Sequence, residues 1–111
     1  MPKKYSKIKR TPSFITMYSG MSAYLKRSSP VAFLALPSAM MVILDAIDRL
    51  PRAWPIKRKR LGGVDHEFHL AIVDFAYRRI HVRYFVDKDD ICYLVAVWVD
   101  GHDEPNYTAF H

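Results

Sequence analysis

The sequence of 111 residues contains a single cysteine, so it lacks the closely spaced cysteine pair that binds zinc in zinc fingers. One cysteine excludes a disulfide framework and a cysteine-based zinc site. Because Cys92 lies inside the apolar segment 91–99, we expect a buried thiol.

Long hydrophobic runs are also lacking. No segment reaches the ~18 uninterrupted apolar residues of a membrane-spanning helix. The best candidate, residues 31–44, is interrupted by Pro37 and Ser38. The basic N-terminus is not followed by the apolar core of a secretion signal. We therefore expect a cytoplasmic protein without a membrane partner.

Glycine is sparse, with four residues, of which Gly62 and Gly63 are adjacent. The Lys-Ser/Thr pair of a phosphate-binding loop does not follow them, which excludes nucleotide hydrolysis of that class. The glycine pair instead predicts a sharp turn.

Acidic residues are outnumbered, since 17 lysines and arginines face 11 aspartates and glutamates, for a net charge of +6 and a pI near 9.6. This surplus favours a polyanionic ligand, most simply nucleic acid, with a membrane surface or an acidic protein as alternatives. Half of the residues are hydrophobic and 14% are aromatic. A chain of 111 residues is expected to form a single domain, and its apolar content suggests that some apolar surface is kept for a partner.

Three segments rich in β-branched and aromatic residues follow one another at 68–74, 78–86 and 91–99, and they predict an antiparallel meander. The last of them is almost entirely apolar, so we expect a central strand covered on both faces. In residues 78–86 basic and apolar side chains alternate, as in a half-buried strand. The basic side comprises Arg79, His81 and Arg83, and the apolar side comprises Ile80, Val82 and Tyr84.

The sequence predicts a basic flexible tail over residues 1–12, followed by a single domain over residues 13–111. Residues 13–18 form a short apolar run that could be an edge strand of the sheet.

Two helical segments are expected next. Residues 21–36 are split by Ser28-Ser29-Pro30, so we expect either one helix bent at the proline or two separate turns. Residues 38–50 show an amphipathic spacing between Pro37 and Pro51, which we expect to act as stops.

Four consecutive cations precede the glycine pair, namely Lys57, Arg58, Lys59 and Arg60. We expect them in a loop that is either a solvated surface or a phosphate-binding segment. The further cations Arg78, Arg79 and Arg83 on the meander favour phosphate binding.

This order of elements resembles the RelE/ParE superfamily of toxins from type II toxin–antitoxin systems, most clearly over residues 49–111. The resemblance implies a small α+β RelE-like fold, with a curled antiparallel sheet packed against two N-terminal helices. The matching features are Leu50-Pro51 at a helix end, Arg60-Leu61-Gly62-Gly63 at a turn, Phe68 at the head of a strand, Tyr77-Arg78-Arg79 and His81-Val82-Arg83-Tyr84 on the next strand, and the final strand and tail over 95–111.

The family divides into ribosome-dependent mRNA endonucleases, such as RelE, YoeB and HigB, and gyrase inhibitors such as ParE. The resemblance implies an endonuclease that uses acid/base chemistry without a metal or cofactor, acts on mRNA at the ribosome, and is bound by a cognate antitoxin. The alternatives are a ParE-like, non-catalytic gyrase inhibitor and a non-toxic basic module that binds nucleic acid.

The resemblance and the titratable side chains give two groups of candidates. Those for catalysis are Arg83, His81, His102, Tyr107 and His111, with His66 and Glu67 as further acid/base candidates. Those for RNA binding are Lys57, Arg58, Lys59, Arg60, Arg78 and Arg79.

Three qualifications apply to these candidates. The family's strand arginine corresponds to Arg83 or, four residues earlier, to Arg79. The tail carries Asp100, Asp103 and Glu104 where RelE is basic, which favours a histidine-based site. The histidines lack the helical i, i+4 spacing of a zinc site, so we expect no metal, and Tyr84 and Tyr93 are expected to pack in the sheet.

Overall fold

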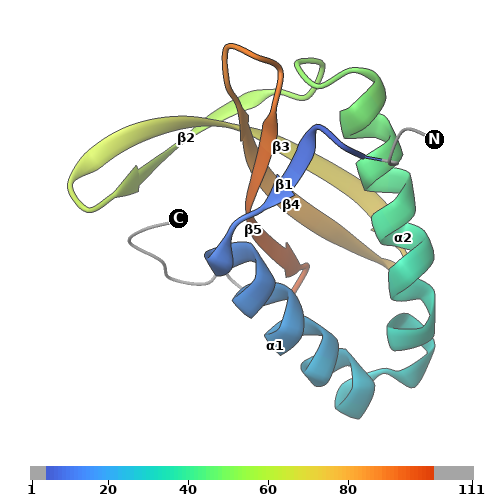
Figure 1. The fold of residues 1–111 in the computed structure, drawn as a ribbon. Coiled ribbons are helices and arrows are strands. Elements are labelled where there is room, and N and C mark those ends of the chain that lie inside the picture. The colour runs from blue at the N-terminus through green and yellow to red at the C-terminus, as the bar shows by residue number, and fades with distance from the viewer. Residues whose placement is uncertain (1–4, 102–111) are drawn as a thin grey trace.

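The computed structural model describes residues 5–101 and contains two helices and a five-stranded mixed sheet (Figure 1). The expected α+β class is confirmed. The elements are β1 (Ile8–Arg10), α1 (Pro12–Ser28), α2 (Pro30–Arg49), β2 (Ile56–Leu61), β3 (Val64–Phe75), β4 (Arg78–Val86) and β5 (Cys92–Val99).

The strand order in the sheet is β1-β5-β4-β3-β2. Strands β3 to β5 form the antiparallel meander that the sequence predicts, and β2 adds a fourth antiparallel strand to it. In contrast, β1 pairs in parallel with β5, so that Ile8 lies opposite Cys92. The sheet is therefore mixed rather than wholly antiparallel, and residues 8–10 of the expected tail belong to it. This pairing leaves β5 between two neighbours, as expected for the most apolar strand.

Helix α1 includes residues 13–18, and the prediction of an edge strand there is wrong. The side-chain oxygen of Thr11 accepts a hydrogen bond from the Phe14 amide at 3.3 Å, and Pro12 follows at the first helical position. Thr11 also donates to the Leu94 carbonyl at 2.8 Å, which ties the helix start to β5. Phe14, Met21 and Leu25 then recur at helical spacing on the buried side of α1, and this spacing continues past Gly20.

Helix α2 begins at Pro30, so the chain is interrupted at Ser28-Ser29-Pro30 as expected. The two parts of residues 21–36 are, however, the end of α1 and the start of α2 rather than one bent helix or two turns. Pro37, expected as a stop, instead lies within the helix. Its missing amide removes one helical hydrogen bond, at a cost of about 3 kcal/mol, which the buried residues on both sides offset. They are Ala32, Leu36, Ala39, Met40, Ile43, Leu44 and Ile47. Helix α2, with a mean hydropathy of 2.0, is also long and apolar enough to cross a membrane. Core helices of soluble proteins can have the same length and composition.

The main core lies between the helices and one face of the sheet. Strand β4 contributes Ile80, Val82 and Tyr84 to it, all fully buried. Tyr84 donates its hydroxyl to the Pro51 carbonyl at 2.6 Å and stacks on His69. Burial raises the pKa of this tyrosine hydroxyl. The sequence expectations of a core Tyr84 and a buried Cys92 are thus confirmed.

Two hairpins have two-residue turns in which both residues have positive φ. Gly62 and Gly63 join β2 to β3 with φ of 58° and 80°, as their pairing in the sequence predicts. Ala76 and Tyr77 join β3 to β4 with φ of 46° and 66°. Side chains other than glycine and asparagine rarely occupy such turns, so the second hairpin is strained.

Strand β2 is formed by the four consecutive cations, so the prediction of a loop there is wrong. Residues 64–68 of β3 pair with β2 alone, His69 pairs with both β2 and β4, and residues 70–75 pair with β4. The β2–β3 hairpin therefore extends beyond the other strands, as the arching yellow-green ribbon in Figure 1 shows.

Candidate nucleic-acid interface

The strand register places five basic side chains on the face of the sheet opposite the helices. In antiparallel strands, directly opposed residues point to the same face. Arg79, His81 and Arg83 of β4 lie opposite Asp74, Ile72 and Leu70 of β3, and Phe68 on that side of β3 lies opposite Lys57. We call this surface the basic face; it comprises Lys57, Lys59, Arg79, His81 and Arg83.

A hydrogen-bonded pair of His81 and Asp100 lies at one end of the basic face. The Nε2 atom of His81 is 2.7 Å from Oδ1 of Asp100. The imidazole stacks on Trp98, with ring centres 5.1 Å apart and planes 4° apart, and its side chain is only 15% exposed. Two contacts in different directions therefore fix the position of the ring.

Arg79 holds the other oxygen of the same carboxylate. Its Nε donates to Oδ2 of Asp100 at 3.0 Å, and the Asp100 amide donates to the Arg79 carbonyl at 2.9 Å. The hydrogen bonds from His81 and Arg79 lower the pKa of Asp100 below its ordinary value. Because an ionised carboxylate only accepts hydrogen bonds, Nε2 of His81 must carry the proton in this pair. In the neutral ring, Nδ1 is then the basic nitrogen.

Arg83 lies two residues along the strand from His81, about 7 Å away at the usual strand rise. It is only 7% exposed and donates from one guanidinium nitrogen to the Lys57 carbonyl at 3.0 Å. Its guanidinium carbon lies 6.0 Å from the ring centre of Phe68 and 5.8 Å from that of Trp98. Arg83 thus connects β4 to β2 as well as supplying positive charge.

The four cations of β2 are divided between the two faces of the sheet. Lys57 and Lys59 lie on the basic face, whereas Arg58 and Arg60 point to the other side. There Arg58 pairs with Glu67 at 3.3 Å and Arg60 with Asp65 at 3.2 Å. The alternation of the strand therefore places two lysines of this charge run on the basic face and two ion-paired arginines on the other side.

The remaining described candidates are divided in the same way. Arg78 lies opposite Phe75, on the helix side, away from His81. His66 lies opposite Lys59 on the basic face and stacks on Phe68, whereas Glu67 lies on the other side. His102, Tyr107 and His111 lie outside the described residues.

Asp100 is a candidate that sequence reasoning missed as a partner of His81; there it counted only as part of an acidic tail. Asp100 can be located from the pairing of His81 with Trp98, because Trp98 lies two residues before Asp100 and on the same face of the sheet. That pairing depends on a register shift between Arg83 and Tyr84, where Val95 is the extra residue.

Chemically, this arrangement suits a phosphodiester with a neighbouring hydroxyl. An oriented imidazole can accept or donate a proton, and arginines on both sides can stabilise negative charge on phosphorus. Across residues 5–101 no group of three or more His, Cys, Asp or Glu side chains is placed to hold a metal ion.

Comparison of the chain with protein-family models, curated proteins and solved structures gave no match. The resemblance to RelE/ParE toxins therefore depends on the order of motifs in the sequence.

Proposed function

We propose that this protein is a RelE-like toxin that cleaves mRNA at the ribosome by acid/base chemistry, with a cognate antitoxin as its protein partner and the cytoplasm as its compartment. The observation that carries the proposal is the His81–Asp100 pair, fixed between Arg79 and Arg83 on the basic face. The resemblance in motif order and the net charge of +6 give further support.

In this proposal Nδ1 of His81 takes the proton from the ribose 2′-hydroxyl, and the resulting oxygen attacks the adjacent phosphorus. The bond from phosphorus to the 5′-oxygen breaks, and a second acid returns a proton to that oxygen; His102, Tyr107 and His111 are the candidates for it. Arg79 and Arg83 stabilise the charge on the phosphorane. The products are a 2′,3′-cyclic phosphate and a 5′-hydroxyl.

The test is brief induced expression in a bacterium, followed by mapping of new 5′ ends across cellular mRNAs. We expect growth arrest and new cuts within coding regions. His81→Gln should reduce cutting about 10²-fold or more, the usual contribution of a general base. Arg58→Gln is the matched control, since it removes a cation from the same sheet but on the opposite face, and it should cut like the wild type.

Other results would redirect the proposal. Growth arrest with uncut transcripts would contradict the nuclease and favour a ParE-like gyrase inhibitor. Harmless expression combined with RNA binding would leave only a basic binding module. Cutting that survives His81→Gln would remove this histidine from the site.

A further inference from the structure

A row of aromatic rings crosses the sheet on the side of the basic face, at the end away from Asp100. Phe68 of β3, Phe85 of β4 and Tyr93 of β5 follow one another on neighbouring strands. The ring centres of Phe68 and Phe85 are 6.4 Å apart, and those of Phe85 and Tyr93 are 4.8 Å apart, with planes at 17°. Phe68 is buried, whereas Phe85 and Tyr93 are half-buried. The row therefore reaches the surface at Phe85 and Tyr93.

The strand register fixes the face on which these two rings lie. Phe85 follows Arg83 by two residues on β4, so both side chains point to the same side of the sheet. Tyr93 lies directly opposite Phe85 and therefore shares that side. Its neighbours along β5, Cys92 and Leu94, belong to the core on the helix side. The ring pair therefore continues the basic face beyond Arg83.

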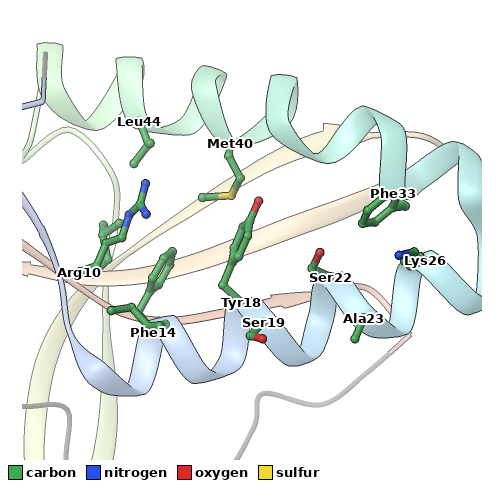
Figure 2. A pocket seen from close by; sticks show the side chains of 12 residues that line it. Arg10, Phe14, Tyr18, Ser19, Ser22, Ala23, Lys26, Phe33, Met40 and Leu44 are labelled. Carbon is green, nitrogen blue, oxygen red and sulfur yellow. The ribbon is translucent and has the colours of Figure 1, made fainter.

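Strand β1 adds a cation beside the last ring. In the parallel pairing of β1 with β5, Lys9 lies opposite Tyr93 and is exposed. The residues on either side of it, Ile8 and Arg10, face the helix side. Figure 2 shows Arg10 there, at one end of a largely apolar groove of about 580 Å³ between α1 and α2, with Lys26 near the other end. Because side chains alternate along a strand, Lys9 points to the side of Tyr93.

A ring stack that reaches the surface beside a cation suits single-stranded nucleic acid. Every base has a π-face that can extend a stack of aromatic rings, and a nearby cation can bind the phosphate next to that base. The row of rings ends at Tyr93, since the residue opposite it on β1 is Lys9. A base can therefore stack at Tyr93 while Lys9 binds an adjacent phosphate.

The distance from His81 sets the place of this ring pair along a bound strand. Phe85 lies four residues from His81 on β4, about 13 Å at the usual strand rise. Arg83 lies midway between them on the same side of the sheet. One nucleotide does not span this distance, so a base at the ring pair belongs to a different nucleotide from the ribose at His81.

We propose that Phe85, Tyr93 and Lys9 form a second subsite for single-stranded RNA, in which Tyr93 stacks on one base and Lys9 binds the adjacent phosphate. Stacking is tolerant of base identity, so the subsite holds the strand without selecting a sequence. The inference rests on the proposed function in taking the same RNA as its ligand. It extends that function from the bond that is cut to the part of the strand that is held.

The test measures binding of the full chain to a labelled single strand of 2′-O-methyl RNA of about eight nucleotides. Its blocked 2′-oxygens cannot attack phosphorus, so affinity is measured without cleavage. An abasic strand with the same backbone and length keeps the phosphates but offers no base to stack. By fluorescence anisotropy, the wild type should bind the strand with bases at least about fivefold more tightly than the abasic strand.

Two variants of Tyr93 separate stacking from packing within the sheet. Tyr93→Leu keeps an apolar side chain against Phe85 but removes the ring. Its affinity for the strand with bases should fall about fivefold or more, and its affinity for the abasic strand should stay at the wild-type level. Tyr93→Phe keeps the ring and should bind both strands like the wild type. A damaged fold would weaken both strands alike, so an effect confined to one strand identifies stacking.

A matched pair of lysine variants tests the phosphate contact. Lys9→Gln should reduce the slope of log affinity against log salt by about 0.7, and equally for both strands, because it removes one phosphate contact. Lys26→Gln removes the same charge from the groove on the helix side and should leave the slope unchanged.

Wild-type affinity of Tyr93→Leu for the strand with bases, or equal losses for both strands, would overturn the stacking assignment. Equal slopes for Lys9→Gln and Lys26→Gln would overturn the phosphate contact. The outcomes also distinguish the subsite from the nuclease. A Tyr93→Leu loss confined to the strand with bases, together with uncut transcripts in cells, would support the subsite and reject the nuclease. Normal cutting by Tyr93→Leu with unchanged affinity would do the reverse.

Discussion

Arg83 carries a positive charge at a position that is only 7% exposed. Its hydrogen bond to the Lys57 carbonyl connects β4 to β2, which is not a neighbour of β4 in the sheet, and its guanidinium also lies over the rings of Phe68 on β3 and Trp98 on β5. A change at Arg83 therefore affects stability as well as any chemistry on the basic face.

We predict that Arg83→Ala lowers the free energy of unfolding by about 1–3 kcal/mol, because it removes a hydrogen bond from a charged donor and leaves a cavity. Arg83→Lys keeps the charge and should lose less. Urea denaturation of both variants measures the difference. An alanine variant as stable as the wild type would show that these contacts of Arg83 contribute nothing to stability. Any loss of activity in that variant would then reflect the chemistry at the site rather than unfolding.

Asp100 acts, in this account, through His81 rather than on the substrate. Asp100→Asn should shift His81 away from the tautomer with the proton on Nε2 and reduce RNA cleavage about 10²-fold. Nitrogen-15 NMR of the imidazole reports the tautomer, a readout that a merely structural role would leave unchanged. An unchanged tautomer together with full cleavage would remove Asp100 from the mechanism.

The lowered pKa of Asp100 also sets a pH dependence of stability. A carboxyl whose folded pKa lies below its unfolded value stabilises the fold above the unfolded pKa and loses that effect as pH falls through the folded one. The urea midpoint of the wild type should therefore exceed that of Asp100→Asn at pH 6, and the two should converge below about pH 4. A difference that persists to the lowest pH would contradict the assigned hydrogen bonds.

At the scale of elements, the hairpins differ in turn chemistry. Both β2–β3 and β3–β4 use two residues of positive φ, but only the first has glycines there. We predict that Ala76→Asn combined with Tyr77→Gly raises the free energy of unfolding by about 1–2 kcal/mol, since the strain of two left-handed residues is relieved. Gly63→Ala, at a φ of 80°, should lower it by about 1 kcal/mol. Thermal unfolding compares both variants, and a destabilised Asn-Gly turn would contradict the account.

The elements also show how far the sequence could predict the structure. Alternation along residues 78–86 and the Gly62-Gly63 pair sufficed for the meander and its first turn. Residues 13–18 were misjudged because a short apolar run cannot distinguish strand from helix without the Thr11-Pro12 cap. The cations of residues 57–60 were placed in a loop because charge outweighed their alternation.

The site depends on a feature that alternation cannot reveal. Near the β4–β5 turn, Tyr84 lies opposite Leu94, and an unbroken register would pair His81 with Val97 and place Asp100 on the helix side. The bulge at Val95 moves the register by one residue, so that His81 meets Trp98 and shares a face with Asp100. A single extra residue therefore creates the His81–Asp100 pair.

At the scale of the whole molecule, the sheet separates two surfaces of different character. The basic face carries the proposed RNA site, and the helix side carries the cation-flanked apolar groove. The lysines of the basic face and the ion-paired arginines of β2 therefore lie on opposite sides of the sheet.

This division predicts which cations matter for RNA. Lys57→Gln with Lys59→Gln should weaken binding of single-stranded RNA and reduce the slope of log affinity against log salt by about 1.4, at about 0.7 for each cation removed. Arg58→Gln with Arg60→Gln removes the same charge from the opposite face and should change binding far less. Filter binding across a salt series measures both, and equal effects would show that charge acts without regard to the face.

The central claim is that His81 on the basic face cleaves RNA through the ribose 2′-oxygen. The measurement that tests it most directly is the chemistry of new RNA ends after induced expression of the wild type, His81→Gln and Arg58→Gln. The account predicts 5′-hydroxyl and 2′,3′-cyclic phosphate ends with the wild type and Arg58→Gln, and at least about 10²-fold fewer of them with His81→Gln. New ends that carry 5′-phosphates, or 5′-hydroxyl ends that persist at the wild-type level with His81→Gln, would contradict it.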